Sequence, residues 1–136
     1  EQGKDNIDNV TIGRTDLTLS YFDPKLRPDS DLIFDLLEKV GKKISNAGLT
    51  MTVGGSLSKN SIERFKKDKD KWSELIFRLE TRKVIMPTKV MLEGKNSIAE
   101  ALRFEELYIL SKKEMSDLFM ESETTRLARL KRKENF

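Results

Sequence analysis

Apolar and polar residues follow two periods along this chain, one typical of strands and one typical of helices. Short apolar runs rich in β-forming residues occur near residues 10–12, 49–53 and 75–79. Between them, apolar residues recur at helical spacing, most clearly from Leu32 to Ala47. We therefore predict strands near residues 9–17, 49–54 and 75–81, each followed by a helix and with no antiparallel hairpin between them.

Capping residues indicate where these helices begin and end. The helix over 32–47 is expected to begin at Asp29 or Ser30 and to end at Gly48, since glycine is a common C-terminal stop. A Ser-x-x-Glu capping-box pattern at Ser97 marks the start of a long helix that we expect to reach about Lys133.

Strands that alternate with helices predict parallel βαβ units, and therefore an α/β fold. We expect one domain over residues 1–136, with a C-terminal helical segment over 97–133. Helices that cover a parallel sheet turn their apolar stripe toward it. Five side chains are accordingly predicted to be buried against the sheet: Leu36, Val40, Ile44, Leu102 and Leu107.

Composition limits the chemistry available to this chain. It contains 37% hydrophobic and 36% charged residues, with no cysteine and no histidine. These absences exclude thiol chemistry, zinc sites built from Cys and His, imidazole acid–base catalysis and a Ser-His-Asp triad within the chain. Catalysis would have to use carboxylates, lysine, arginine, tyrosine, hydroxyl groups or a metal held by oxygen ligands.

Charge and hydropathy indicate the compartment. The net charge of +3 is too small to indicate nucleic-acid binding, and most of the excess lies in a basic cluster near the C-terminal end. No apolar run is long enough for a bilayer span, and no signal-like segment stands at the first residues. We expect a soluble, cytoplasmic protein without a membrane partner.

Polar residues follow each predicted strand at the point where it ends. They are Arg14 and Asp16 after the first, Gly54, Gly55 and Ser56 after the second, and Glu80, Arg82 and Lys83 after the third. Carboxyl ends of parallel strands meet at one edge, where ligands bind in both barrels and open α/β sheets. Each group also has a structural interpretation: a surface ion pair, a tight strand-to-helix turn, and charges that pair among themselves.

These strand-end sequences resemble a known family. The runs Gly13–Ser20, Val53–Ser56 and Glu80–Lys83 are similar to the last three strands of the HpcH/HpaI aldolase and citrate lyase beta-subunit family, in the phosphoenolpyruvate-binding barrel superfamily. The resemblance implies the C-terminal half of a (β/α)8 TIM barrel. It also implies a lyase that makes or breaks a carbon–carbon bond in a 2-oxo acid or acyl-CoA substrate.

Specific roles follow from the resemblance. The family's sixth strand carries a Gly-x-x-Asp-Leu pattern whose aspartate binds Mg²⁺ or Mn²⁺, and Asp16 matches it. Arg14 would place positive charge near the substrate oxygen. The Gly54-Gly55-Ser56 turn would receive a carboxylate or phosphate through backbone N–H groups, while Glu80 and Arg82 would orient the substrate.

A complete barrel of this kind runs to about 250 residues, so the resemblance covers part of one. The family's second metal-binding carboxylate and its substrate-binding arginine belong to earlier strands. We therefore expect the missing N-terminal half of the barrel, or another copy of this chain, as a partner. Exposed sheet edges and an apolar inner face would drive that association.

Two other function classes stay open. The amphipathic helix over 97–119 and its basic extension could make the chain a non-catalytic protein-interaction module. The basic cluster could also bind nucleic acid, although acidic residues lie among its members and no aromatic residue is interleaved with them. The cluster consists of Arg126, Arg129, Lys131, Arg132 and Lys133.

Overall fold

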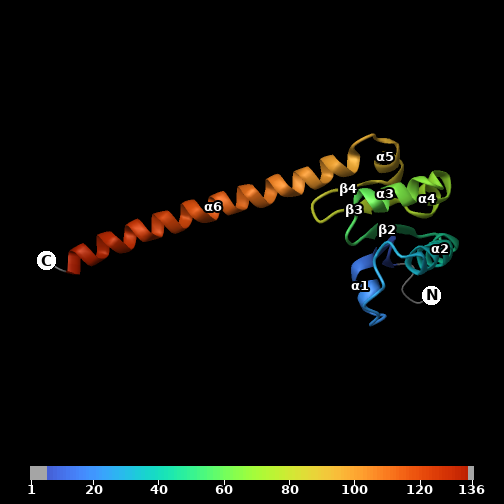
Figure 1. Cartoon of the computed structure of the whole chain (residues 1–136), viewed down its shortest axis with the longest axis horizontal. Helices are drawn as coiled ribbons and strands as arrows, with labels where there is room; N and C mark the ends of the chain where they lie inside the picture. Colours follow the sequence, from blue (N-terminus) through green and yellow to red (C-terminus); the bar gives the residue numbers. More distant parts are fainter. Residues whose placement is uncertain (1–5, 135–136) are drawn as a thin grey trace. The chain divides into compact units, whose positions relative to one another are not determined.

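The computed structural model describes residues 6–134 and contains a four-stranded mixed sheet with a long C-terminal helix (Figure 1). The strands lie in the order β1 (Asn9–Gly13), β2 (Thr50–Gly54), β3 (Arg78–Glu80) and β4 (Ile85–Pro87). The helices are α1 (Arg14–Leu19), α2 (Asp31–Asn46), α3 (Lys59–Lys66), α4 (Lys69–Leu75), α5 (Thr88–Glu93) and α6 (Ser97–Glu134).

The first three strands confirm the predicted parallel arrangement. β1 pairs with β2 in parallel from Asn9–Thr50 to Gly13–Gly54, and β2 pairs with β3 in parallel at Val53–Leu79. Helices connect each of these strands to the next, as in consecutive βαβ units. The chain is therefore a mixed α/β protein.

The first strand is shorter than the predicted range 9–17. β1 ends at Gly13, and Arg14–Leu19 forms the short helix α1. Hydroxyl groups support this turn, because Thr18 Oγ1 donates to the Arg14 carbonyl and Ser20 Oγ donates to the Leu17 carbonyl. The Leu17-Thr18-Leu19 run, which fits a strand pattern, is therefore helical.

The prediction that a helix follows the third strand is wrong. β3 turns directly into β4, which runs antiparallel to it with Leu79 opposite Met86. The connecting turn is closed by the Thr81 amide, which donates to the Val84 carbonyl, and by the Thr81 hydroxyl, which accepts from the Val84 amide. A threonine that holds its own turn in this way favours a hairpin over a crossover.

The predicted helix caps are partly confirmed. Ser30 is the N-cap of α2, and Gly48, with φ of +74°, directly follows its C-cap. Ser58 caps α3 through a reciprocal bond with Ser61. Ser97, however, is the first residue of α6, and its hydroxyl donates to the Val90 carbonyl at 3.5 Å.

The hydrophobic core lies between one face of the sheet and the helices α2 to α5. Three aromatic rings form its centre, with centroids 4.8 Å apart for Phe34 and Phe65 and 5.2 Å apart for Phe65 and Trp72. Val53 and Leu79 from the sheet are fully buried against this cluster. Burial of such apolar side chains is the main favourable contribution to folding.

The five predicted core positions have different outcomes. Ile44 is buried. Leu36 and Val40 are half-buried, and Val40 packs against the core. Leu102 and Leu107 are 38% and 49% exposed, so their predicted burial is wrong. The shorter helices α2 and α5 contribute fully buried side chains to the core instead, among them Ile33, Leu37 and Met91.

The face of the sheet opposite the core is polar. Because side chains alternate along a strand, Thr11, Thr52 and Arg78 form one row across β1, β2 and β3 on this face. The Asn9 side chain bonds to threonine hydroxyl groups of both β1 and β2. The expected apolar inner face is therefore wrong for β1 to β3, whose apolar residues point to the helices; on β4, Ile85 pairs with Glu80 and lies on this face, where it is 60% exposed.

The chain divides into two compact units, Glu1–Leu102 and Arg103–Phe136. Unit 1 contains the sheet, α1 to α5 and the first residues of α6, and unit 2 contains α6 from Arg103 to Glu134. Within residues 6–134, no helix combines the length and the apolar character that a bilayer crossing requires.

An ion-pair cluster joins α2 to α4 and predicts an acid response. Glu38 accepts hydrogen bonds from Lys42 at 2.7 Å and Lys71 at 3.0 Å, and these bonds lower the pKa of its carboxyl group. A lowered folded-state pKa contributes stability at neutral pH that is lost as the pH falls through that pKa. We expect Glu38→Gln to lose less stability than the wild type between pH 7 and about pH 3.

Urea unfolding of both proteins at the two pH values measures this difference. Glu74→Gln is the matched control, because Glu74 is an exposed carboxylate on α4, and it should lose as much stability as the wild type. Equal losses in Glu38→Gln and wild type would contradict the assignment.

Candidate functional site

The Arg14 side chain lies completely buried at the carboxyl edge of the sheet. It follows the last residue of β1, and its guanidinium group reaches across to the turn after β2. Nε donates to the Gly54 carbonyl at 3.4 Å, and Nη2 donates to the Gly55 carbonyl at 2.9 Å and to Ser61 Oγ at 3.1 Å. Nη1 donates to the Pro28 carbonyl at 3.2 Å and to Asp29 Oδ1 at 2.6 Å.

These contacts engage all five N–H donors of the guanidinium group. Burial lowers the pKa of Arg14, while the hydrogen bond and the charge of Asp29 oppose that effect. An arginine stays protonated in this setting, so the charge is neutralised internally by Asp29. Arg14 was predicted to place positive charge beside a substrate oxygen, and its engaged donors instead tie β1, β2, α3 and the loop before α2 together.

The Gly54-Gly55-Ser56 turn is held against the start of α1. A Cβ atom on Gly55 would lie 2.6 Å from the backbone nitrogens of both Arg14 and Thr15, so the two backbones are in direct contact. Ser56 has a φ of +53°, and its hydroxyl lies 2.8 Å from Thr15 Oγ1. This pair of hydroxyl groups is exposed beside the predicted anion-binding turn.

Asp16 and Glu80 lie above neighbouring strand ends. Gly13 and Gly54 are register partners at the ends of β1 and β2. A Cβ atom on Gly13 would lie 3.5 Å from Asp16 Oδ2, and one on Gly54 would lie 2.8 Å from Glu80 Oε1. Since paired residues of adjacent strands point to the same face and the strands are about 4.8 Å apart, the two carboxylates lie above adjacent strands on the polar side of the sheet.

Arg82 lies apart from this group. It is an exposed residue of the turn between β3 and β4, beyond the strand end where Glu80 stands. Lys83 follows it in the same turn, where its amide donates to Thr81 Oγ1 at 3.4 Å. The structure thus brings together Arg14, Gly54, Gly55, Ser56 and Glu80 and places Asp16 beside them.

The described part of the chain, residues 6–134, contains no cluster of three Asp, Glu, His or Cys side chains that could hold a metal ion. Asp16 is exposed and Glu80 is half-buried. Two carboxylates suit Mg²⁺, which commonly takes one or two such ligands and completes its shell with water and substrate oxygens.

Three residues of this region were not singled out from the sequence as site residues. Asp29 was assigned only as a helix cap, but it is the ion-pair partner of Arg14 at 2.6 Å. The Ser61 hydroxyl accepts a hydrogen bond from Arg14. The Thr15 hydroxyl is hydrogen-bonded to the Ser56 hydroxyl. The Pro28-Asp29-Ser30 sequence marks a turn, and nothing in that local signal indicates a contact with a residue fifteen positions earlier.

Comparison of the chain with protein-family models, with curated proteins and with solved structures gave no significant match, so the resemblance to the HpcH/HpaI aldolase and citrate lyase beta-subunit family rests on its strand-end motifs.

Proposed function

We propose that this chain supplies part of the active site of a metal-dependent carbon–carbon lyase of the aldolase or citrate lyase type. The substrate class is a 2-oxo acid or an acyl-CoA, and the metal is Mg²⁺ or Mn²⁺. The observation that carries the proposal is the position of the Asp16 and Glu80 carboxylates over the register partners Gly13 and Gly54. Carboxyl ends of consecutive parallel strands are where α/β enzymes hold their ligands.

The strand arrangement supports a barrel segment in this proposal. β1, β2 and β3 are parallel neighbours in chain order, with helices in the connections. Neighbouring strands of a (β/α)8 barrel are related in the same way. The antiparallel β4 occupies the β3 edge, where a barrel has a parallel strand, so the remaining strands and metal ligands would have to join at the β1 edge, from another polypeptide or another copy.

Most of the predicted site residues then have a defined task. Asp16 and Glu80 would hold the metal, which would supply positive charge next to the substrate carbonyl oxygen. Ser56 and the adjacent backbone N–H groups would bind the substrate's carboxylate or phosphate, whereas Arg82, which lies apart from them, has no assigned contact. Arg14 is a positioning residue, because its side chain holds the Gly54-Gly55 turn in place.

Metal titration tests the proposal. Mn²⁺ binding to the chain, alone and with the polypeptide that completes the barrel, is measured by electron paramagnetic resonance for the wild type, Asp16→Asn and Glu80→Gln. We expect each variant to bind Mn²⁺ at least about tenfold more weakly, as expected for the loss of a charged ligand, with little change in unfolding free energy.

Asp23→Asn is the matched control, because Asp23 is an exposed loop carboxylate and should bind Mn²⁺ as the wild type does. Lyase activity of the completed protein toward 2-oxo acids should disappear in Asp16→Asn and remain in Asp23→Asn. Equal Mn²⁺ affinity in all four proteins would remove the lyase assignment and favour a non-catalytic interaction module.

A further inference from the structure

A hollow of about 210 Å³ lies on unit 1, between α3, α5 and the first residues of α6. Three buried apolar side chains line it, since Ile62, Met91 and Ile98 are at most 7% exposed. Leu102, which the sequence predicted to be buried, also lines the hollow and is 38% exposed. The apolar part of a ligand in this hollow would cover Leu102 as well, and removing such surface from water is favourable.

Lysine side chains line the same hollow. Lys59 and Lys66 belong to α3, and Lys95 belongs to the segment between α5 and α6. Glu63 is the acidic residue in the lining, and its Oε1 lies 3.8 Å from Lys66 Nζ. Among residues 6–134, Lys59 and Lys95 have no ion-pair partner. Two positive charges beside the hollow are therefore not neutralised within the described part of the chain.

We propose that this hollow binds a small amphipathic anion, with a short aliphatic chain on the apolar side chains and a carboxylate or phosphate group beside Lys59 and Lys95. The charges of the two lysines favour an anion over a neutral ligand. The Asn96 side chain also lines the hollow, and its amide can donate to the same group. The volume is below the roughly 300–1,000 Å³ of sites for drug-sized ligands, which favours a short chain.

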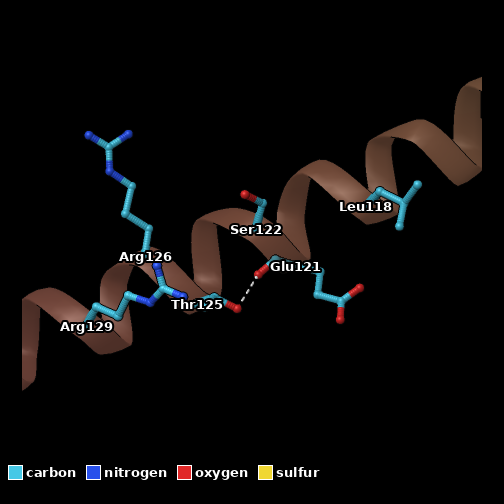
Figure 2. A pocket seen from close by; sticks show the side chains of 6 residues that line it. All are labelled: Leu118, Glu121, Ser122, Thr125, Arg126 and Arg129. Carbon is cyan, nitrogen blue, oxygen red and sulfur yellow. Dashed lines mark hydrogen bonds between the residues drawn. The ribbon is translucent and has the colours of Figure 1, made fainter.

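Positive side chains beside a hollow do not by themselves select such a ligand. Figure 2 shows a hollow on α6 that is lined by Arg126 and Arg129, where Leu118 is the one apolar side chain among the six labelled. All six belong to α6, whereas apolar side chains from α3, α5 and α6 line the hollow on unit 1. An amphipathic anion requires both the charge and the apolar surface.

NMR titration of the isotope-labelled full chain with octanoate tests the proposal. We expect saturable shifts of the methyl signals of Ile62, Met91 and Ile98, which line the hollow. Octyl phosphate in a parallel titration compares the two head groups. The test does not depend on the lyase assignment, because the hollow lies among helices and the Asp16 and Glu80 carboxylates lie at the strand ends.

Neutral and shortened probes separate the two parts of the interaction. Octanamide has the same chain without the charge, so it should bind about tenfold more weakly than octanoate. Butanoate has the charge and four fewer methylene groups. Each buried methylene is worth about fourfold in affinity, so butanoate should bind weaker still.

Substitutions in the lining test the same two parts. Lys59→Gln combined with Lys95→Gln should weaken octanoate binding about tenfold and leave octanamide binding unchanged. Lys67→Gln combined with Lys89→Gln is the matched control, because these exposed lysines remove the same charge from outside the lining. This control should bind octanoate as the wild type does. Ala99→Trp, at an exposed position of the lining, should fill the hollow and abolish binding of both probes.

Three results would overturn the proposal. Absence of saturable shifts at Ile62, Met91 and Ile98 with both octanoate and octyl phosphate would show that the hollow does not take such an anion. Equal affinity for octanoate and octanamide would show that the lysines do not contribute. Equal weakening in the two double lysine variants would indicate a general effect of charge in place of a site at this hollow.

Discussion

Replacing Arg14 with methionine is expected to lower the free energy of unfolding by about 3–5 kcal/mol, the usual cost of removing one partner of a buried ion pair. The side chain is fully buried, and methionine fills a similar space without any donor. Three backbone carbonyls, the Asp29 carboxylate and the Ser61 hydroxyl would each lose a hydrogen bond. Buried acceptors without a partner are costly because water cannot replace the lost donor.

Urea unfolding followed by Trp72 fluorescence measures this effect, because Trp72 is the only tryptophan and is 4% exposed in the core. Arg27→Met is the matched control, since Arg27 is an exposed arginine of the same loop region, and it should change stability by less than about 1 kcal/mol. Arg14→Lys keeps the charge with fewer donors in a different geometry, so its loss should fall between the two. Equal stability of Arg14→Met and Arg27→Met would contradict the structural role of this guanidinium group.

Gly55→Ala is expected to be the second most damaging substitution, with a loss of about 2–5 kcal/mol from backbone strain and steric overlap together. Gly55 has a φ of +85°, which L residues with a side chain rarely adopt. Its new methyl group would also lie 2.6 Å from two backbone nitrogens at the start of α1. Backbone atoms cannot move aside as a flexible side chain can, so the contact between the turn and α1 would open.

Gly48→Ala separates the two causes. Gly48 has a φ of +74°, yet nothing lies within 4 Å of the position that a Cβ atom would take. This variant therefore carries the conformational cost alone, about 1–2 kcal/mol. Comparable losses in the two variants, measured by the same urea unfolding, would mean that the contact with α1 contributes little to stability.

The Gly55 variant also connects stability to the proposed function. The turn that it would displace carries Ser56 and lies next to Gly54, over which the Glu80 carboxylate is placed. A shift of this turn should weaken Mn²⁺ binding through Glu80 as well as lower stability. Gly48 lies between α2 and the first residue of β2, at the opposite end of the strand from Gly54, so Gly48→Ala should leave Mn²⁺ binding unchanged.

Elements with a strong local signal were predicted from the sequence. α2 follows from its apolar period and from Ser30 and Gly48 at its ends, and the parallel β1 and β2 follow from the helix between them. The helix expected after the second strand is α3, where Ser58 is the N-cap and Ile62 and Phe65 are buried. Each of these signals lies within one element or its caps, where neighbouring residues decide the conformation.

Tertiary contacts decided the remaining features. Leu17 and Thr18 fit a strand pattern, but they lie in α1 because the chain turns into helix at Arg14. The β3–β4 hairpin replaces an expected helix because β4 pairs with the free edge of β3. Neither outcome can be predicted from the spacing of apolar residues along the chain. Both depend on which surfaces are available for pairing once the sheet has formed.

Arg14 shows the same division most clearly. Its charge and its place at a strand end are properties of the sequence, and they led to a prediction of substrate contact. Its actual partners are up to 47 positions away, at Asp29, Gly54, Gly55 and Ser61. The sequence alone determined α2, the parallel pairing of β1, β2 and β3, and the polar groups at their ends. Only the tertiary structure decided that one of these groups is buried and fully bonded, because burial depends on residues brought together by the whole fold.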